Sequence, residues 1–484
     1  MTTAPLHSDI APSYDRDTLG HGIVHFGMGN FHRAHQAMYI DRLARAGKAR
    51  GWGIVGVGVM EADKRMRDAL RAQAGAYTLV LKHPDGHFSP TVIGSVTDML
   101  YAPEEGQAVL DLLASPNTHV VSLTVTEGGY PVDDATGAFV ATETTRRDAA
   151  DPRQPAGVFG YIVEGLRRRR EAGIAPFTVV SCDNLPGNGH IAHTAVVGQA
   201  RLFDNELAAW IDDAVAFPNS MVDRITPVTT DADREFVRER LEVDDAVPVT
   251  AEPFEQWVLE DRFTDTRPPL EDAGVQIVDD VRPYELMKLR LLNAAHQSLA
   301  HWGRLIPLVY AHEAAVDADV AAITRAYLER EARPTLAPVP GIDLDTYVDT
   351  LFERFSNASI ADTLARLAQD ASDRMPKFVL GAARDNLVAG RDVSIAAAMC
   401  AAWAAGVRGR AEDGSEILLD DQAAGPLSEA ARCADRAQVP EAFLGLEQIF
   451  GSLGEATVFI EAFRDAWERL ERDGVRSLMR TLAS

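Results

Sequence analysis

The sequence predicts an α/β protein in which a doubly wound, largely parallel sheet is followed by a mostly α-helical domain. Its 484 residues are too many for one ordinary hydrophobic core. Strand-like and helix-like segments alternate in the N-terminal half, and the strand pattern ends near residue 281. We therefore expect one domain over residues 1–280 and a second, helical domain over residues 281–484, with a cleft between them.

Five short runs rich in β-branched residues predict the strands of the first domain. They are residues 23–26, 53–59, 77–81, 119–126 and 177–182, and each ends near Gly, Asn or Asp. Helical patterns such as 34–46 and 158–170 lie between several of them. Strands that alternate with helices form βαβ units, so we expect one parallel sheet covered by helices on both faces.

The second half of the chain has helical patterns only. We expect helices over residues 283–299, 313–331, 360–369 and 440–450, and a proline-rich connection over 332–343. The alanine-rich segment 395–407 is shorter than the roughly 18 to 20 residues that span a bilayer. We therefore predict that it is a buried helix.

Composition excludes several classes of partner. The chain has 47 Lys and Arg against 72 Asp and Glu, a formal net charge of −25. Such a surface repels nucleic acid and anionic lipid, and it suits a small neutral substrate. The sparse cysteines, Cys182, Cys400 and Cys433, form no CxxC pair, and the first residues lack a signal-peptide pattern. These features favour a reducing cytoplasm.

A glycine-rich turn between a strand and a helix predicts a dinucleotide site in a Rossmann-type domain. Gly27 allows the tight turn, and Gly29 lets a pyrophosphate approach backbone N–H groups at the helix start. His32 stands where the usual fingerprint has its third glycine. The expected cofactor-binding residues of this segment are Gly27, Met28, Gly29, Asn30, Phe31 and Arg33. The alternative is an ordinary β-turn-α junction.

Acidic residues after the second strand favour NAD over NADP. Asp63, with Glu61 nearby, can accept hydrogen bonds from the adenosine ribose and repel a 2′-phosphate. Lys64 and Arg65 follow directly and could instead hold that phosphate. A third interpretation is that both acids only face solvent at a helix start.

The apolar segment around residues 284–299 carries three polar residues that suit alcohol oxidation. At about 100° per residue, Lys288, Asn293 and His296 fall within one side of an α-helix. Burial would favour the neutral amine of Lys288, which could take the hydroxyl proton, while Asn293 and His296 stabilise the alkoxide. The alternative is a surface lysine beside an Asn and a His that cap the core.

We expect no metal in this chemistry. A zinc site needs Cys and His ligands within tetrahedral reach. His32 and His35 are close in the sequence, but they stand at the start of the expected cofactor helix.

Long segments of the chain resemble the polyol-specific long-chain dehydrogenases, the family of the mannitol 2-dehydrogenases. They are GMGNFHRAHQA (27–37), LTVTEGGY (123–130), FTVVSCDNLPGNG (177–189), FPNSMVDRITP (217–227), EPFEQWVLED (252–261) and MKLRLLNAAH (287–296), with LAPVPGIDL (336–344) and RFSNASIAD (354–362). The resemblance covers nearly the whole chain. It implies a metal-free, NAD-dependent enzyme, commonly a monomer, that interconverts a sugar alcohol such as mannitol and its ketose.

The resemblance also implies roles for individual residues. Lys288 matches the family's general base, and Asn293 and His296 its alkoxide-stabilising pair. Asn184 and Asp223 match positions that line the sugar and cofactor pocket, Arg366 and Arg374 match cationic positions that bind polyol hydroxyls, and Glu127 is expected near the nicotinamide, where it could relay protons. The position of Arg374 is a lysine in close relatives.

Two other functions stay open at this stage. Uronate reductases of the fructuronate or tagaturonate type belong to the same superfamily, although the TEGGY (126–130) and PKF (376–378) segments favour a neutral polyol. A catalytically inert NAD-binding sensor is the second alternative, and the intact Lys288, Asn293 and His296 argue against it. Mannitol, sorbitol and arabitol all fit the sequence equally well as substrates.

Overall fold

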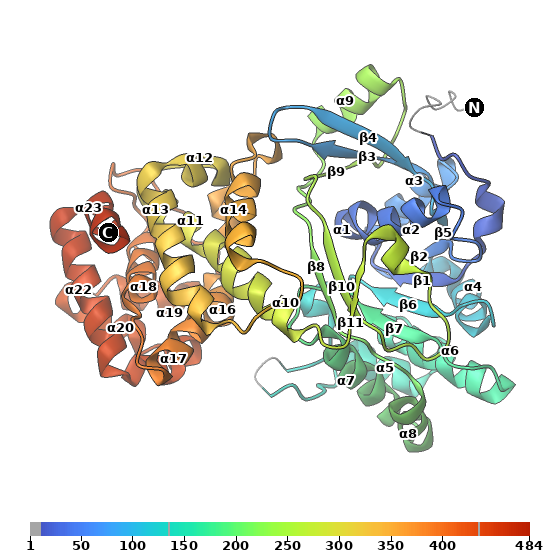
Figure 1. Cartoon of the computed structure of the whole chain (residues 1–484). Helices are drawn as coiled ribbons and strands as arrows, with labels where there is room; N and C mark the ends of the chain where they lie inside the picture. Colours follow the sequence, from blue (N-terminus) through green and yellow to red (C-terminus); the bar gives the residue numbers. More distant parts are fainter. Residues whose placement is uncertain (1–10, 134–135, 434–435) are drawn as a thin grey trace. The chain divides into compact units, whose positions relative to one another are not determined.

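The computed structural model describes residues 11–133, 136–433 and 436–484, which form two compact units (Figure 1). Unit 1 comprises the described residues up to His83 together with His87–Arg282, and unit 2 comprises Pro84–Gly86 together with Pro283–Ser484.

Unit 1 is built on a five-stranded sheet of wholly parallel strands, in the order β5-β2-β1-β6-β7. The strands are β1 (Ile23–Phe26), β2 (Ile54–Gly58), β5 (Val96–Tyr101), β6 (Val120–Leu123) and β7 (Thr178–Ser181). From β1 the chain adds strands first on one side and then on the other, which confirms the predicted doubly wound sheet. The carboxyl ends of β1 and β6 therefore meet where the strand order reverses, the place at which such sheets bind ligands.

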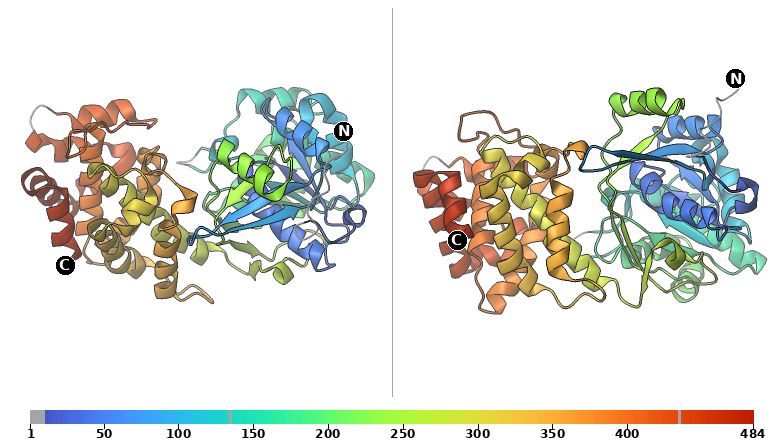
Figure 2. Two further views of the ribbon diagram at one scale, coloured as in Figure 1. Left: turned by 90° about the horizontal axis from the view of Figure 1, so that it is seen from above. Right: turned by 45° about the horizontal axis from the view of Figure 1, so that its top comes forward.

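Helices cover both faces of this sheet, because successive residues of each strand point to opposite sides. Val24 and Phe26 of β1 belong to one core, and Ile23 belongs to the other. The first core is closed by α4 (Ala102–Ala114), α6 (Val158–Ala172), α7 (Asn188–Arg201) and α8 (Asn205–Ala214), and the second by α1 (Asn30–Ala34) and α2 (Gln36–Arg45) (Figures 1 and 2). The remaining helices of unit 1 are α3 (Asp63–Ala72), α5 (Glu143–Ala150) and α9 (Asp231–Leu241).

The predicted strand over residues 77–81 exists, but it does not join the parallel sheet. It is β3 (Tyr77–Lys82), which pairs antiparallel with β4 (Phe88–Ile93) and parallel with β9 (Val249–Ala251). The edge of the parallel sheet is β5 instead, a strand that we did not predict. Its Asp98 and Met99 interrupt the β-branched pattern, and the long-range pairing with β2 identifies it as a strand.

The helix expected over residues 34–46 is broken at His35. This residue has φ −124° and ψ −88°, so the chain forms the short α1 and then α2. The His35 ring hydrogen-bonds the carbonyl oxygen of Gln256 at 2.9 Å. Gln256 begins β10 (Gln256–Glu260) of a third sheet, which also contains β8 (Ser220–Asp223) and β11 (Gln276–Val278).

Within the described residues 283–433 and 436–484, unit 2 contains helices and isolated β-bridges but no strand (Figure 2). The helices are α10 (Arg282–Met287), α11 (Ala294–Leu305), α12 (Ala311–Val316), α13 (Ala318–Tyr327), α14 (Leu344–Phe355), α15 (Leu364–Leu367), α16 (Ala371–Met375), α17 (Gly381–Val388), α18 (Ser394–Val407), α19 (Ala424–Ala431), α20 (Val439–Leu444), α21 (Glu447–Phe450), α22 (Thr457–Asp473) and α23 (Val475–Ala483). The alanine-rich helix α18 is buried, as predicted. Among the residues that the structure describes, no helix is long and apolar enough to cross a membrane.

Three π-turns interrupt the helices of unit 2, and two of them fall in helices that we expected to be continuous. They are Lys288–Asn293, Leu328–Ala332 and Pro376–Leu380. The predicted helix 283–299 is therefore α10, a π-turn and α11, and the predicted helix 313–331 is α12, α13 and a π-turn. The predicted helices 360–369 and 440–450 are also shorter than expected: the first contains only α15, and the second is divided into α20 and α21. Hydrophobic periodicity does not distinguish an α-turn from a π-turn.

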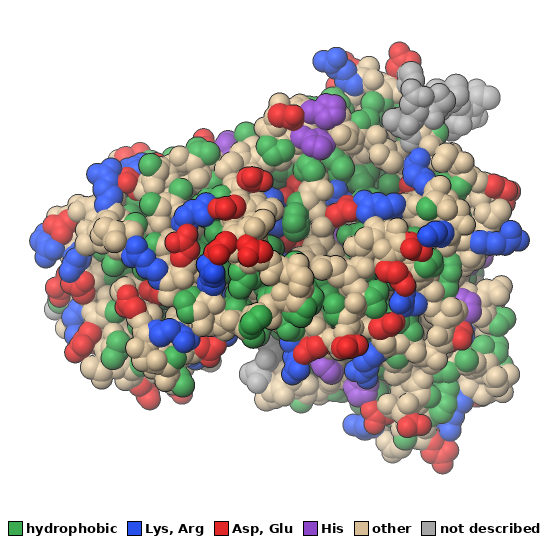
Figure 3. Space-filling view, viewed as in Figure 1, with side chains coloured by type: hydrophobic (Ala, Val, Ile, Leu, Met, Phe, Trp, Pro, Cys, Tyr) green, Lys and Arg blue, Asp and Glu red, His purple; other side chains and the backbone are tan. Residues whose placement is uncertain are grey.

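Acidic and basic side chains are interspersed on the face of the molecule seen in Figure 3. In unit 2, Arg476 of α23 pairs with Asp317 at 2.9 Å and with Asp319 at 2.8 Å, and Arg480 also pairs with Asp319. Isolated surface pairs contribute little, but a network of this kind restrains α23 against the start of α13.

A buried glutamate in the second π-turn caps helix α18. The Glu331 side chain is almost fully buried and accepts the backbone N–H groups of Ile395 at 2.6 Å and Ala396 at 2.9 Å. Burial raises the pKa of Glu331 from its usual 4.5 to about 8. The folded protein therefore binds this proton more tightly than the unfolded chain does.

We predict that Glu331 makes the stability of the protein fall as the pH rises from about 4.5 to about 8. In that window the unfolded chain releases the proton and the folded protein retains it, so the free energy of unfolding decreases with pH. Glu331→Gln cannot ionise and should lack this part of the slope in urea unfolding measured from pH 5 to pH 9. The exposed Glu329→Gln is the matched control. Parallel pH profiles for wild type and Glu331→Gln would contradict the assignment.

Candidate functional site

The glycine turn after β1 has the two properties that a dinucleotide needs. Gly27 has φ +96°, and a Cβ there would lie 2.0 Å from the carbonyl oxygen of Thr124, so only glycine fits. Gly29 is exposed, and a Cβ there would meet nothing closer than the Gly27 carbonyl oxygen at 3.9 Å. The first N–H groups of α1 have no side-chain cap, so they are available to an anion in this open space.

Two stacked histidines hold the turn and explain the missing third glycine. The buried His25 ring contacts the Gly27 carbonyl oxygen at 3.1 Å, Thr124 Oγ1 at 2.9 Å and Ser122 Oγ at 2.8 Å. Burial lowers the pKa of His25 to about 3, so the ring is neutral. His32 lies flat against it, with ring centroids 3.4 Å apart. A flat ring thus provides the close helix–strand packing that a glycine usually allows.

Several side chains that we predicted to bind the cofactor point into unit 1 instead. Met28 is buried against Gly56 of β2. Arg33 is buried and donates hydrogen bonds to Asn30 Oδ1 at 2.6 Å and to the carbonyl of Val247. Phe31 stacks on the His35 ring, with centroids 4.9 Å apart. These side chains position α1, so contacts from this segment to a cofactor would come mainly from its backbone.

Asp63 lies at the carboxyl end of β2, beside the glycine turn in the sheet order. It is the first residue of α3, and its carboxylate accepts the Met60 N–H at 2.9 Å. The absence of a side chain at Gly58 allows this close approach, because a Cβ there would lie 2.3 Å from that of Asp63. Glu61 is exposed in the same turn. The position of Asp63 fits an acid that bonds an adenosine ribose.

Asp183, which we did not predict, joins the loops that follow β6 and β7. Its carboxylate accepts the N–H groups of Val125 at 3.1 Å and Thr126 at 2.8 Å and the Tyr130 hydroxyl at 2.6 Å. Thr126 has φ +67°, a conformation that costs a β-branched residue on the order of 1–3 kcal/mol. The Asp183 contacts hold this strained loop and thereby the exposed Glu127 that follows it. The sequence signal for Asp183 is the CDN motif, in which the resemblance to the family implies a role for Asn184 alone.

Asn184 and Asp223 come from neighbouring elements of unit 1. Asn184 is exposed in the loop after β7, and Asp223 is the buried last residue of β8. The Asn188 amide nitrogen joins the two elements by donating to the carbonyl oxygens of Asp183 at 3.1 Å and Ser220 at 2.8 Å. The structure therefore brings the Asn184 loop next to the strand that carries Asp223.

In unit 2 the first π-turn aligns Lys288 with Asn293. In an α-helix these two residues would lie about 140° apart around the axis, whereas the i to i+5 hydrogen bonds of a π-turn place them one turn apart on the same face. Asn293 is buried, and its side-chain nitrogen has no hydrogen-bond partner among the described residues. A buried N–H without an acceptor costs about 1–3 kcal/mol, so a ligand oxygen at this point would be stabilised.

His296 and Glu285 flank this turn. His296 lies three residues after Asn293 in α11, and its ring packs against Phe355 of α14 with centroids 4.8 Å apart. Glu285 is buried one helical turn before Lys288. We did not predict Glu285, although its spacing of three residues from Lys288 was visible in the sequence.

Arg366 and Arg374 are brought together on α15 and α16. Arg374 donates to the carbonyl oxygens of Arg366 at 3.0 Å and Leu367 at 3.1 Å. Arg366 holds the carboxylate of Asp362 with two nitrogens, and that contact raises the pKa of its guanidinium. Gln297, next to His296, donates to the Leu367 carbonyl at 2.9 Å. Both arginines thus lie on elements attached to the helix that carries His296.

A small cavity lies inside unit 1. It has a volume of about 30 Å³, enough for a few water molecules at most, and Ile23, Ile54 and Val120 line it at the beginnings of their strands. It is therefore too small for a nucleotide, although His32, which packs against the glycine turn, is part of its lining. Within the described residues, no group of three or more His, Cys, Asp or Glu side chains could hold a metal ion, and all three cysteines are free.

Comparison with known proteins gives a match over most of the chain. Residues 21–272 match the family description "Mannitol dehydrogenase Rossmann domain", and residues 280–471 match "Mannitol dehydrogenase C-terminal domain". The chain is 43% identical over 470 residues to a mannitol 2-dehydrogenase of Cereibacter sphaeroides, covering 97% of this chain and 98% of that protein.

Two solved structures resemble the whole chain. The first is a Pseudomonas fluorescens mannitol 2-dehydrogenase in ternary complex with NAD and D-mannitol, at 42% identity and a TM-score of 0.87, with 99% of this chain and 97% of that chain covered. The second is a D-sorbitol dehydrogenase in substrate-free form, at 37% identity and a TM-score of 0.91, with 98% of each chain covered.

Proposed function

Because the chain belongs to the mannitol dehydrogenase family, we propose that it is an NAD-dependent polyol dehydrogenase that interconverts a sugar alcohol and its ketose. The observation that carries the proposal is the π-turn of unit 2. It supports a site in which Lys288, as proton acceptor, and the buried side-chain nitrogen of Asn293, which has no hydrogen-bond partner among the described residues, would address one oxygen from the same face. The similarity to a mannitol and to a sorbitol dehydrogenase supports a polyol as substrate.

The residues of unit 1 suit NAD as the cofactor. The open space beside Gly29 and the uncapped start of α1 would take the pyrophosphate, and Asp63 would bond the adenosine ribose. Glu127, in the loop at the end of β6, would lie near the nicotinamide. When bound, NAD accepts a hydride from the carbon that carries the reacting hydroxyl.

The residues of unit 2 would perform the proton chemistry. The neutral amine of Lys288 would take the hydroxyl proton, and Asn293 and His296 would donate hydrogen bonds to the alkoxide oxygen that forms. In the reverse direction the Lys288 ammonium would return the proton. Arg366 and Arg374 would bind the remaining polyol hydroxyls. For Asn184 and Asp223 of unit 1, the resemblance to the family supports a role in polyol binding as well.

A substrate panel tests this proposal. We expect NADH formation with NAD⁺ and at least one of D-mannitol, D-sorbitol and D-arabitol, and NADH consumption with the corresponding ketose. Fructuronate and tagaturonate, tested with NADH, are the comparison that distinguishes a uronate reductase. Binding of NAD without turnover of any of these compounds would indicate a sensor instead. Size-exclusion chromatography with light scattering would check the expected monomer.

We predict that activity survives exhaustive chelation, because a lysine base can take the proton without a metal-bound water. The measurement is turnover after dialysis against EDTA, beside a sample to which zinc has been returned. Loss of turnover with EDTA and its recovery with zinc would contradict the metal-free mechanism.

A further inference from the structure

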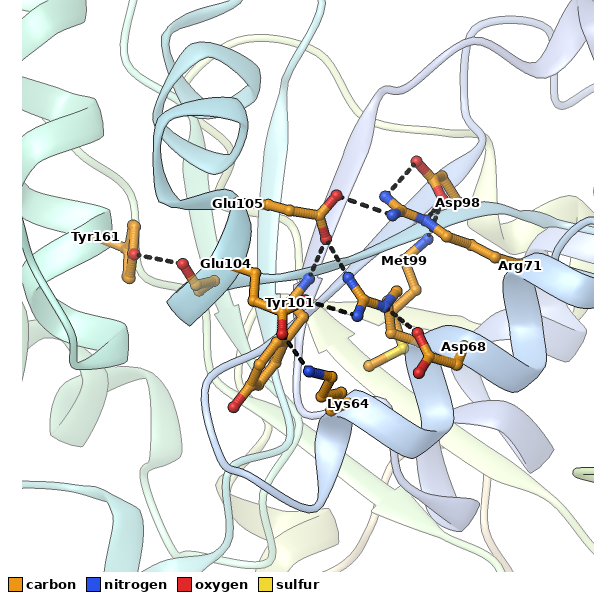
Figure 4. Close-up of polar contacts among 11 residues, drawn as sticks. Lys64, Asp68, Arg71, Asp98, Met99, Tyr101, Glu104, Glu105 and Tyr161 are labelled. Carbon is orange, nitrogen blue, oxygen red and sulfur yellow. Dashed lines mark hydrogen bonds and ion pairs between the residues drawn. The ribbon is translucent and has the colours of Figure 1, made fainter.

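A network of ion pairs joins α3 to the start of α4, close to the end of β2 (Figure 4). Lys64, the second residue of α3, pairs with Glu104. Arg67, one turn further along α3, contacts Glu104 and Glu105 at 2.9 Å each and Asp68 at 2.6 Å. Two of the three cations in this part of α3, Lys64 and Arg67, are therefore bound to carboxylates of the same unit, and the third, Arg65, is exposed.

Lys64 links this network of ion pairs to the proposed binding site of the adenosine ribose. Lys64 directly follows Asp63, which our proposed function places at the adenosine ribose. A cation at this point is the group that would hold the 2′-phosphate of NADP. In the structure its ammonium is directed to Glu104 instead (Figure 4). The Lys64 ammonium also lowers the pKa of Glu104, which keeps that carboxyl ionised.

We propose that Glu104 is a specificity-determining residue, which disfavours NADP by holding Lys64 and by placing a negative charge beside the adenosine ribose. The inference rests on the proposed NAD site and extends it to a residue of α4. A 2′-phosphate carries about −1.5 to −2 charges at pH 7, so it would meet the charges of Asp63 and Glu104 while Lys64 is engaged elsewhere. NAD has no group at this position, so its binding does not depend on Lys64.

Glu104 is a better candidate than its neighbour Glu105. The Glu105 carboxylate accepts the Tyr101 N–H at 2.9 Å and pairs with Arg71 at 2.8 Å, so it fixes the junction of β5 and α4. In the part of the chain that the structure describes, Glu104 contacts side chains only, and the side chains of Lys64 and Glu104 are 49% and 43% exposed. The pair can therefore separate without disturbing the backbone.

The test compares the two cofactors in Glu104→Gln. Exposed ion pairs contribute up to about 1 kcal/mol, so we expect the ratio of kcat/KM for NADP⁺ over NAD⁺ to rise about fivefold. The same shift is expected in the ratio of the two dissociation constants, measured by isothermal titration calorimetry without polyol. An unchanged ratio in both measurements would overturn the proposal.

Two further variants isolate the cause. Asp68→Asn removes the same charge from the network without releasing Lys64, and its ratio should change less than that of Glu104→Gln. When Lys64→Met is already present, adding Glu104→Gln should change the ratio of kcat/KM for NADP⁺ over NAD⁺ much less than it does in the wild type. Equal shifts in Asp68→Asn, or a full shift without Lys64, would refute a role through Lys64. Because binding is measured without polyol, failure to oxidise polyols would count against the proposed function alone.

Discussion

Lys288→Ala should lower kcat for polyol oxidation by about two to four orders of magnitude, the range expected when a general base is removed. The amine lies on the π-turn of unit 2, whereas the glycine turn that would bind the cofactor phosphates belongs to unit 1. The dissociation constant of NAD should therefore change little. In the wild type, oxidation should become faster as the pH rises, because only the neutral amine accepts a proton. Steady-state kinetics over a pH series, with NAD titrations in parallel, provides the measurement.

Lys288→Arg is the control that separates a base from a fixed positive charge. An arginine keeps the charge but cannot lose its proton at accessible pH. If Lys288 acts as a base, the arginine variant should be nearly as slow as the alanine variant. Small amines should partly restore the alanine variant by occupying the vacated space. A folded Lys288→Ala protein with near-normal turnover and an unchanged pH profile would refute the assignment.

Gly29→Ala should weaken NAD binding by about ten- to a hundredfold, the loss expected when charge-assisted backbone hydrogen bonds to the pyrophosphate are broken. The added methyl group would project into space that the protein leaves open, since the nearest protein atom is 3.9 Å away. The free energy of unfolding should therefore remain within about 0.5 kcal/mol of the wild type. Calorimetric titration with NAD and urea unfolding test the two statements independently.

Gly27→Ala is the matched comparison on the other side of the same turn. Its methyl group would lie 2.0 Å from a backbone oxygen, at a residue with φ +96°. We expect a loss of about 1–3 kcal/mol in the free energy of unfolding, in addition to weaker binding. If both variants were destabilised equally, or if Gly29→Ala bound NAD normally, Gly29 would not be the place of closest phosphate approach.

The sequence alone determined the features that depend on local patterns or on long matching motifs. The alternation of strands and helices predicted the doubly wound sheet, and the two glycines predicted a turn that only glycine can form at residue 27. The segments from GMGNFHRAHQA (27–37) to MKLRLLNAAH (287–296) identified the family, which the match to both of its domains confirms. Such features can be predicted without knowing which residues far apart in the sequence contact each other in the fold.

Tertiary structure decided which side chains face a ligand and which hold the fold. Arg33 and Met28 lie in a motif that predicts cofactor contact, yet both are buried in unit 1. Asp183 belongs to the CDN motif, but the motif does not show what it binds, because its partners are more than fifty residues away in the chain, in the loop after β6. The sequence contains the groups, but the pairing of β6 with β7 brings them together.

The alignment of Lys288 and Asn293 is the clearest case in which the sequence supplies the residues and the tertiary structure decides their arrangement. Counting residues on an α-helix placed them about 140° apart, within one broad side. The π-turn puts them one turn apart on one face, and the Asn293 side-chain nitrogen has no partner within residues 11–133, 136–433 and 436–484. Whether a helix makes i to i+4 or i to i+5 hydrogen bonds depends on the helices packed around it, here the other two π-turns of unit 2. The sequence therefore specified which residues carry the proposed chemistry, and the packing of unit 2 decided how they are aligned.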